Sequence, residues 1–205
     1  MFQARRTGAA EDISRLKSEL DELEQAKVQL EERLKNEIAQ NQVKVEMLER
    51  GLVITLVAEV LFDSGKDHLR PPALETLGKI SSVLKTTVRD LPIGVEGHTD
   101  NVPIKFSGWK SNWELSTARA LSVLHCLIDV QAIDPQRLSA TGYGEYRPLT
   151  SNETSEGRKK NRRVEIVILP KMIQNRTGDE KIVSRRNFNE TSSPKTSKPS
   201  EEGLK

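Results

Sequence analysis

The chain has one cysteine, few aromatic residues and no long hydrophobic run. Because Cys126 has no second cysteine to pair with and lies in an apolar stretch, we interpret it as a buried thiol. Aromatic residues make up 4% of the 205 residues, which indicates that part of the chain forms no core. The expected organisation is therefore one ordinary domain with two extensions.

A strong charge of one sign is also lacking. The formal net charge is +2, which gives no reason to expect nucleic acid or an anionic membrane as a partner. Residues 1–12 lack the apolar core of a secretory signal, and the longest apolar run, residues 51–62, is interrupted by Glu59. The sequence as given therefore shows no export signal and no membrane span.

Apolar residues recur near the N-terminus with the spacing of a coiled coil. The seam consists of Ile13, Leu16, Leu20, Leu23, Leu30 and Leu34. Lys27 occupies the one missing place, and the register resumes with a stutter through Ile38, Val45 and Leu48. We therefore predict a helix that pairs with a second copy in a homodimer, while a solvated single helix stays open as the alternative.

The domain limits follow from these patterns. We predict a disordered start over residues 1–11 and a coiled-coil helix over residues 12–50. Residues 51–170 form the globular domain. Residues 171–205 are polar and have no periodicity, so we predict a disordered tail there.

Strands and helices alternate within residues 51–170. Strands are predicted over residues 52–62, 93–98, 138–141 and 164–169. Helices are predicted from the Pro71-Pro72 pair to about Val88, and from Ser111 through Ile128. At the start of the second helix, Ser111 and Glu114 have the spacing of a capping box. The alternation predicts an α+β fold with a mixed βαβαββ sheet and its helices on one face.

Four motifs follow one another in the second half of the domain. They are GHTDNVPI (97–104), SNWELSTARA (111–120), TGYGEYRP (141–148) and GRKKNRRVEI (157–166). In this order and at these intervals they resemble the OmpA-like C-terminal domain of outer-membrane anchors, peptidoglycan-associated lipoproteins and MotB-type stator proteins. The resemblance implies an OmpA-like two-layer sandwich that binds peptidoglycan non-covalently through the diamino acid of its stem peptide, without catalysis, metal or cofactor.

The resemblance also implies the two poles of the site. The diamino acid offers an ammonium and a carboxylate, so its receptor needs a fixed anion and a fixed cation. By the family motifs, Asp100 accepts the ammonium and Arg119 is the bidentate donor to the carboxylate. The alternative is a structural ion pair between the strand end and the helix.

Further residues match family positions near the ligand. Asn112 and Leu115 correspond to residues that line the pocket, and Arg162 to a basic residue near the bound carboxylates. Thr99 and Asn101 flank Asp100 and are expected to orient it.

The loop after Asp100 is longer than in simple outer-membrane anchors, and its sequence resembles the stator branch of the family. Trp109 and Trp113 either close over the sugar or peptide or pack the loop on the helix. The stator branch carries a membrane helix with a proton-carrying aspartate, which this sequence does not show. A stator-like component or a coiled-coil scaffold, whose globular domain is mainly structural, is therefore the alternative function.

Two rival functions have weak support. A wall hydrolase would use Glu96, Asp100 or Glu114 near His98 as acid and base. A nucleic-acid binder would use the basic run GRKKNRR (157–163), but no aromatic residues are interleaved with it. His98 has no second histidine at ligand spacing, so we expect no metal.

The resemblance implies a location in the cell envelope, on the periplasmic face, associated with the outer membrane or the wall. Because the ligand lies outside the cytoplasmic membrane, either the chain starts upstream or another element carries it across. A membrane-anchored partner at the far end of the helix is one such element.

Overall fold

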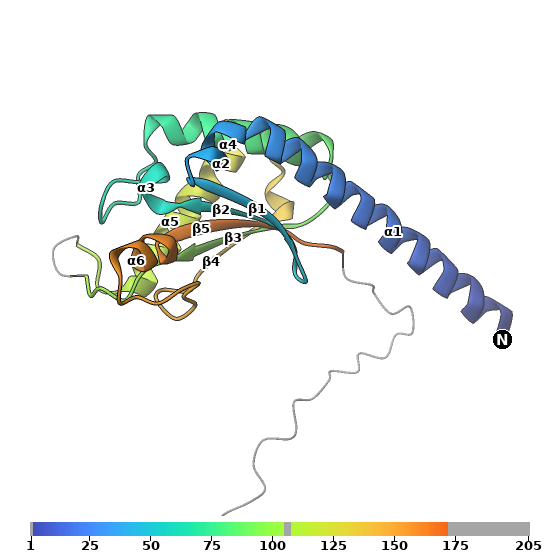
Figure 1. The fold of residues 1–205 in the computed structure, drawn as a ribbon. Coiled ribbons are helices and arrows are strands. Elements are labelled where there is room, and N and C mark those ends of the chain that lie inside the picture. Colours follow the sequence, from blue (N-terminus) through green and yellow to red (C-terminus); the bar gives the residue numbers. More distant parts are fainter. Residues whose placement is uncertain (1, 105–107, 172–205) are drawn as a thin grey trace, which may run out of the picture. The chain divides into compact units, whose positions relative to one another are not determined.

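The computed structural model describes residues 2–104 and 108–171, with side chains from residue 13 onward. A five-stranded sheet in the order β1-β2-β5-β3-β4 lies at its centre (Figure 1). The strands are β1 (Val43–Leu48), β2 (Gly51–Val57), β3 (Ile93–His98), β4 (Leu138–Gly142) and β5 (Arg163–Ile168). β3 and β4 are parallel and the other neighbouring pairs are antiparallel, so the predicted mixed sheet is confirmed.

Helices α1, α4 and α5 lie on one face of the sheet (Figure 1). The helices are α1 (Phe2–Arg33), α2 (Lys35–Ala39), α3 (Ala58–Leu61), α4 (Pro71–Thr86), α5 (Asn112–His125) and α6 (Ser155–Asn161), with a π-helical turn at Cys126–Val130 and a 3₁₀ turn at Pro135–Arg137. Alternate strand residues such as Ile54, Val95 and Ile166 are fully buried under these helices. The α+β prediction with helices on one face is thus confirmed.

The prediction of one helix over residues 12–50 is wrong beyond Ala39. Asn41 adopts a left-handed backbone with φ of 55° and turns the chain, and residues 43–48 form β1 against β2. Val43 and Val45 are buried there while Lys44 is exposed, which is the period of two of a strand. The sheet thus begins upstream of the expected boundary at Gly51. The sequence was misleading because, over six residues, this alternation resembles a displaced heptad seam.

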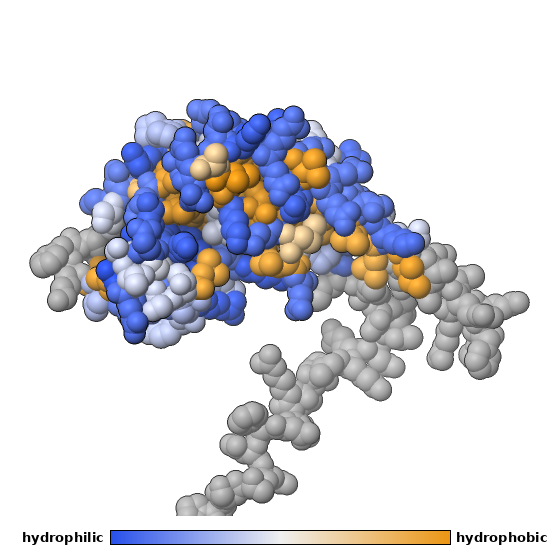
Figure 2. All heavy atoms as spheres, in the orientation of Figure 1, coloured by the Kyte–Doolittle hydropathy of each residue, from blue (hydrophilic) through white to orange (hydrophobic). Residues whose placement is uncertain are grey.

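The N-terminal prediction also needs correction, because α1 begins at Phe2, where the sequence predicted a disordered start over residues 1–11. The seam of α1 divides into two parts. Leu23, Leu30 and Leu34 are buried in the core of their own domain, whereas Ile13, Leu16 and Leu20 are exposed. Figure 2 shows hydrophobic surface along this exposed stretch of α1.

The helix boundaries of the domain agree with the sequence prediction, but the capping box does not form. Ser111 occupies the cap of α5 without a side-chain hydrogen bond. Glu114 instead accepts a hydrogen bond from the Lys110 backbone N–H at 2.6 Å. After α5 the chain continues through the π-helical turn, where Cys126 is buried as predicted and burial raises the pKa of its thiol.

Two short helices were not predicted. The run 52–62 divides into β2 and α3, and α6 lies within the basic motif before β5. The Thr154 side chain caps α6 by accepting from the Gly157 N–H at 3.0 Å. Helices of four and seven residues are too short to show a clear period in the sequence.

Of the predicted polar tail, all residues after Lys171 lie outside the described part of the chain. Within the part that is described, no helix combines the length and the apolar composition needed to cross a membrane.

We expect Leu30→Ala to lower the free energy of unfolding by about 2–5 kcal/mol, because it leaves a cavity between α1 and the core. The matched control is Val28→Ala on the same helix, where Val28 is exposed and the change should stay within about 0.5 kcal/mol. Urea denaturation of the full chain measures both. Equal stability of the two variants would contradict the packing of α1 against its own domain.

Candidate ligand-binding site

Two glycines allow α5 to lie directly on the ends of β3 and β4. A Cβ atom at Gly97 would be 1.9 Å from the Ser116 carbonyl oxygen, and one at Gly142 would be 2.1 Å from Thr117 Oγ1. No larger residue fits at either position without moving the helix. The segment that follows β3 is therefore held against the beginning of α5.

A cavity of about 620 Å³ opens beside this junction. Its lining comes from α3 and the loop after it, the loop after β3, one side of α5, and the basic segment of α6. The lining residues are Ala58, Glu59, Phe62, Asp63, Ser64, Gly65, Lys66, Thr99, Asp100, Val102, Pro103, Ile104, Asn112, Leu115, Arg119, Arg158 and Arg162. Six of the seven predicted site residues are among them. The seventh, Asn101, is exposed and does not line the cavity.

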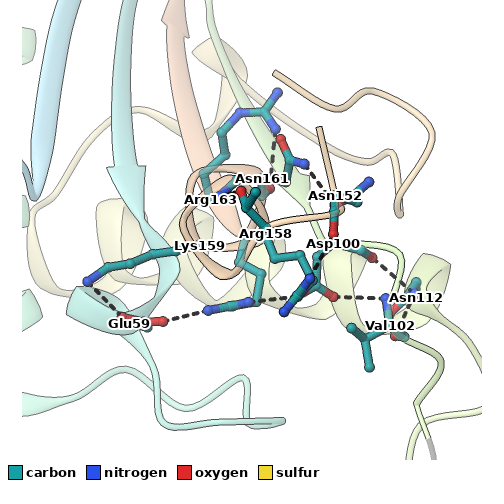
Figure 3. Close-up of polar contacts among 12 residues, drawn as sticks. Glu59, Asp100, Val102, Asn112, Asn152, Arg158, Lys159, Asn161 and Arg163 are labelled. Carbon is teal, nitrogen blue, oxygen red and sulfur yellow. Dashed lines mark hydrogen bonds and ion pairs between the residues drawn. The ribbon is translucent and has the colours of Figure 1, made fainter. Parts of the chain in front are cut away.

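Asp100 is fixed by contacts from three directions, and only 7% of it is exposed. Its Oδ1 accepts from the Val102 N–H at 3.1 Å, and its Oδ2 accepts from Arg162 Nη1 at 2.6 Å. The Asn112 amide donates to the carbonyl oxygens of Asp100 and Val102 at 3.3 and 3.2 Å (Figure 3). The loop after β3 thus presents a rigid carboxylate.

Arg162 joins Asp100 to a second carboxylate, Glu59 on α3. Its Nη2 donates to Glu59 at 2.6 Å, and Lys159 lies 3.3 Å from the other oxygen of Glu59. Burial opposes the charge on Arg162, but its hydrogen bonds to Asp100 and Glu59 outweigh this and raise the pKa of the guanidinium. The hydrogen bond from Arg162 lowers the pKa of Glu59, so this pair stays ionised.

Arg119 is in a different situation, because it forms no ion pair with a carboxylate among the described residues, although the charges of Asp100 and Asp67 are near enough to favour its charged form. Only 4% of Arg119 is exposed. Its Nε donates to the Lys66 carbonyl at 2.9 Å and its Nη2 to the Asp63 carbonyl at 3.5 Å, while its guanidinium lies 5.1 Å from the Phe62 ring centroid. Burial, and next the charge of Arg162, lower the pKa of Arg119 to about 10. The group is charged at neutral pH and retains N–H donors for an anion.

The structural ion pair between Asp100 and Arg119, considered as an alternative for these residues, is therefore not formed. Asp100 pairs with Arg162, which is 62 positions away in the sequence. Both residues of the expected receptor line the same cavity but do not neutralise each other.

Thr99 and Leu115 complete the predicted part of the lining. The Thr99 N–H donates to the Gly144 carbonyl at 2.9 Å, whereas its hydroxyl is buried without a hydrogen-bond partner in the described residues. Leu115 contributes a mostly buried apolar wall. A buried hydroxyl without a partner is a polar group that water or a ligand group can satisfy only if it gains access.

Sequence reasoning missed Glu59, the loop over residues 62–66, and Arg158 as parts of the site. Arg158 Nη1 donates to the carbonyls of Asn152 and Glu153, which holds the guanidinium at the cavity. A signal was present for Glu59, because it is the charged residue that interrupts the apolar run of 51–62.

Asn161 and Arg163, which flank Arg162 in the fourth motif, hold loops in place. The Asn161 side chain bonds Leu149 and Thr150 in the preceding loop. Arg163 donates to Glu165 at 2.5 Å and to the carbonyls of Asn161 and Arg147. Neither residue lines the cavity.

Acidic side chains near His98 form a separate cluster on the other face of the sheet. Potential metal-ligating atoms of Glu96, His98 and Glu165 lie within 4.8 Å of one another. The sequence pattern did not indicate this cluster, because it contains only one histidine. Arg50 donates to both glutamates and Arg163 to Glu165, so both carboxylates already have cationic partners. We therefore assign this cluster to a structural ion-pair network.

The carboxylates considered for a hydrolase do not meet in the cavity. Asp100 lines it, but Glu96 and Glu114 do not. Glu96 is paired with Arg50, and Glu114 accepts from the Lys110 N–H. Of the three carboxylates considered for a hydrolase, only Asp100 lines this cavity.

Comparison with known proteins identifies the family. Residues 61–162 match the OmpA family, and the structure of the cell wall anchor of the T6SS from Pseudomonas aeruginosa is 33% identical, with a TM-score of 0.63 over 69% of this chain and 97% of that one. This chain belongs to the OmpA family. A putative MotB-like protein from Desulfovibrio vulgaris has a TM-score of 0.66, 30% identity, and matches 73% of this chain and 94% of that one.

Motility protein B of Bacillus subtilis is 44% identical to this OmpA-family chain over 153 residues. The match covers 74% of this chain and 58% of that relative. The similarity agrees with the resemblance to the stator branch inferred from the motifs. The chain spans less than two thirds of this relative's length.

We expect His98 to make the OmpA domain sensitive to acid. Burial, and next the charge of Arg163, lower the pKa of His98 to about 3. Between pH 6.5 and 3 the unfolded chain therefore binds a proton that the folded chain does not, so stability falls as the pH drops and is unaffected above pH 7. For one such histidine the loss from pH 7 to pH 4 is about 3 kcal/mol.

The test is His98→Phe, which keeps an aromatic ring to stack on Tyr143 and sacrifices no hydrogen bond, since neither ring nitrogen has a partner in the described residues. Urea unfolding at pH 7 and pH 4 should show a smaller acid loss in the variant than in the wild type. His125→Phe, at an exposed histidine, is the matched control. An unchanged acid loss in His98→Phe would refute the assignment.

Proposed function

We propose that this OmpA-family protein is a non-enzymatic anchor that binds peptidoglycan through the diamino acid of the stem peptide. One observation carries the proposal: the cavity contains a fixed carboxylate, Asp100, and a buried guanidinium, Arg119, that forms no ion pair with a described carboxylate. A diamino acid supplies the complementary ammonium and carboxylate at its free end. The cavity is thus suited to a zwitterion.

Arg119 is the proposed receptor for the carboxylate. Its Nε and one Nη already donate to backbone carbonyls, which orients the planar fork. Because the surroundings exclude most water, an arriving carboxylate would form charge-assisted hydrogen bonds that are stronger than those at a surface. Binding of a ligand carboxylate would therefore stabilise the positive charge of the buried Arg119 guanidinium.

Asp100 is the proposed receptor for the ammonium. Each of its oxygens already accepts one hydrogen bond, and each has a further lone pair. An ammonium would compete with Arg162 for Oδ2 and leave that guanidinium able to turn toward the ligand carboxylate. Arg162 would thus bind Asp100 in the empty site and the ligand carboxylate in the occupied site. Its ion pair with Glu59 would hold it near the cavity in both.

The remaining predicted residues have supporting roles. Thr99 lines the cavity, and its hydroxyl would bond a polar group of the peptide if binding opens access to it. Leu115 offers an apolar surface to the methylene chain of the diamino acid. Asn112 shapes the loop that carries Asp100. Asn101 is exposed and follows Asp100 in that loop, so we give it no direct contact with the ligand.

The relatives support an envelope role. One structural relative is named as a cell wall anchor, and sequence relatives include motility proteins and outer membrane proteins. We therefore infer a location on the periplasmic face of the envelope, with a membrane-anchored partner as the proposed attachment. A stator-like component is the second candidate, favoured by the 44% identity to Motility protein B.

Dimerisation is part of the proposal. Each charged anchor contributes about 1.5–3 kcal/mol, which suggests weak binding of a single stem peptide. The exposed seam residues Ile13, Leu16 and Leu20 are free to pair with a second copy. Two domains on one polymer would raise avidity by about 10²–10⁴-fold.

The first test is co-sedimentation of the full chain with isolated sacculi. Asp100→Ala and Arg119→Ala should each lower the affinity by about 10- to 100-fold, because each removes one pole of the receptor. Asp90→Ala and Arg89→Ala are the matched controls, since both side chains are exposed and lie outside the cavity. Circular dichroism must show that all four variants are folded.

Wild-type protein that stays in the supernatant would overturn wall binding and favour the scaffold. If the wild type pellets and Arg119→Ala pellets equally well, the binding is real but the carboxylate receptor is wrong. Arg119→Lys separates charge from geometry, because lysine keeps the charge and loses the bidentate fork.

The second test addresses the seam. We expect the combined variant Ile13→Ser, Leu16→Ser, Leu20→Ser to sediment as a monomer in analytical ultracentrifugation and to bind sacculi more weakly, while its affinity for a soluble stem peptide is unchanged. Val28→Ser, an exposed position outside the seam, is the control. We choose substitutions because deletion of all residues before Gly51 would also remove β1 and the buried Leu30. A variant that remains dimeric would refute pairing through this seam.

A further inference from the structure

Two exposed aromatic side chains form a stacked pair next to the cavity. Trp113 is 48% exposed and Tyr146 is 65% exposed. Their ring centroids are 5.1 Å apart and their planes differ by 23°. Trp113 directly follows Asn112, which lines the cavity, so the pair stands one residue beyond the proposed peptide site.

The segment that carries Tyr146 is fastened to the cavity wall. Glu145 accepts from the Asn112 amide at 2.6 Å, the same amide that fixes the loop of Asp100. The Gly144 N–H donates to Ser116 Oγ at 2.9 Å, and the Gly144 carbonyl accepts from the Thr99 N–H at 2.9 Å. The position of Tyr146 is therefore tied to that of two residues that line the site.

The exposure of this pair contrasts with that of the other large aromatic residues nearby. Trp109 donates its indole N–H to the Gly65 carbonyl at 3.0 Å, which packs the loop after β3 against the loop after α3. Tyr143 is covered by the Arg147 guanidinium, 3.8 Å from its ring centroid, and stacks on His98. Trp113 supports Tyr146 from one side, which leaves the outer face of Tyr146 to solvent.

We propose that the Trp113–Tyr146 pair is a second subsite, which stacks a sugar ring of the glycan strand while the stem peptide occupies the cavity. This inference rests on the proposed function. The stem peptide is covalently attached to a sugar, so a bound peptide holds that sugar within a few residues of the cavity, at about 3.3–3.6 Å per residue. Neither ring lines the cavity, but Glu145, the neighbour of Tyr146, accepts a hydrogen bond from Asn112, which does line it.

The chemistry of the pair suits a sugar. The apolar C–H face of a pyranose packs on the electron-rich face of an aromatic ring, and the rigid rings lose little conformational freedom on binding. Among the contacts of the described residues, Glu145 uses one carboxylate oxygen for Asn112, which leaves the other to accept from a sugar hydroxyl. The neutral sugar requires no counter-charge, in contrast to the peptide in the cavity.

The test compares two soluble ligands of the full chain by isothermal titration calorimetry. One is a synthetic stem tripeptide that contains the diamino acid, and the other is a muropeptide that carries the same tripeptide on its disaccharide. Tyr146→Ala should weaken muropeptide binding about three- to tenfold and leave tripeptide binding within twofold, as expected for the loss of one aromatic stack. Tyr146→Phe keeps the ring and should bind both ligands like the wild type.

Leu149→Ala controls for truncation of an exposed apolar side chain in the same segment, and Trp113→Ala provides a second test of the pair. If Tyr146→Ala binds both ligands as tightly as the wild type does, the sugar subsite is overturned and the peptide site stands. If Tyr146→Ala loses the same affinity for the tripeptide and the muropeptide, the sugar subsite is again overturned, because Tyr146 then acts on the peptide. A wild type that binds neither ligand would overturn the proposed function and this inference with it.

Discussion

The close approach of α5 to β3 and β4 is the constraint on which the rest of the site depends. Gly97 and Gly142 permit it, because a Cβ atom at either position would occupy space that α5 already fills. The approach fixes the end of β3, and with it Asp100, opposite the face of α5 that carries Asn112 and Arg119. The packing of the α5 backbone on the strand ends therefore brings side chains of opposite charge to one cavity.

Within that cavity the charges are arranged unequally. Asp100 is held by Arg162, which Glu59 also binds, so the anionic side of the site is pre-organised by an ion-pair network. Arg119 is held by backbone carbonyls, which orient the guanidinium without neutralising it. A buried arginine without an ion-pair partner among the described residues would gain more from an anion than an exposed arginine would, because little water competes.

Helix α1 connects the domain to its surroundings in two different ways. Leu23, Leu30 and Leu34 belong to the core of the domain, whereas Ile13, Leu16 and Leu20 extend the same stripe beyond it into solvent. One continuous helix is thus part of the fold at one end and exposes an apolar stripe at the other, the surface proposed for pairing. Such a rigid connection would transmit force between a wall-bound domain and whatever holds the far end of the helix.

The sequence by itself determined the elements with a sustained period, β2, β3, β5, α4 and α5, and the motifs that carry Asp100 and Arg119. It did not determine β1, because six alternating residues fit a displaced heptad as well as a strand until β2 supplies the hydrogen bonds. The partner of Asp100 is Arg162, 62 positions away, and the stacking of Trp113 on Tyr146 joins segments about 33 positions apart. Tertiary structure decided these pairings, since local pattern reports which face a residue occupies and only the folded chain brings distant faces together.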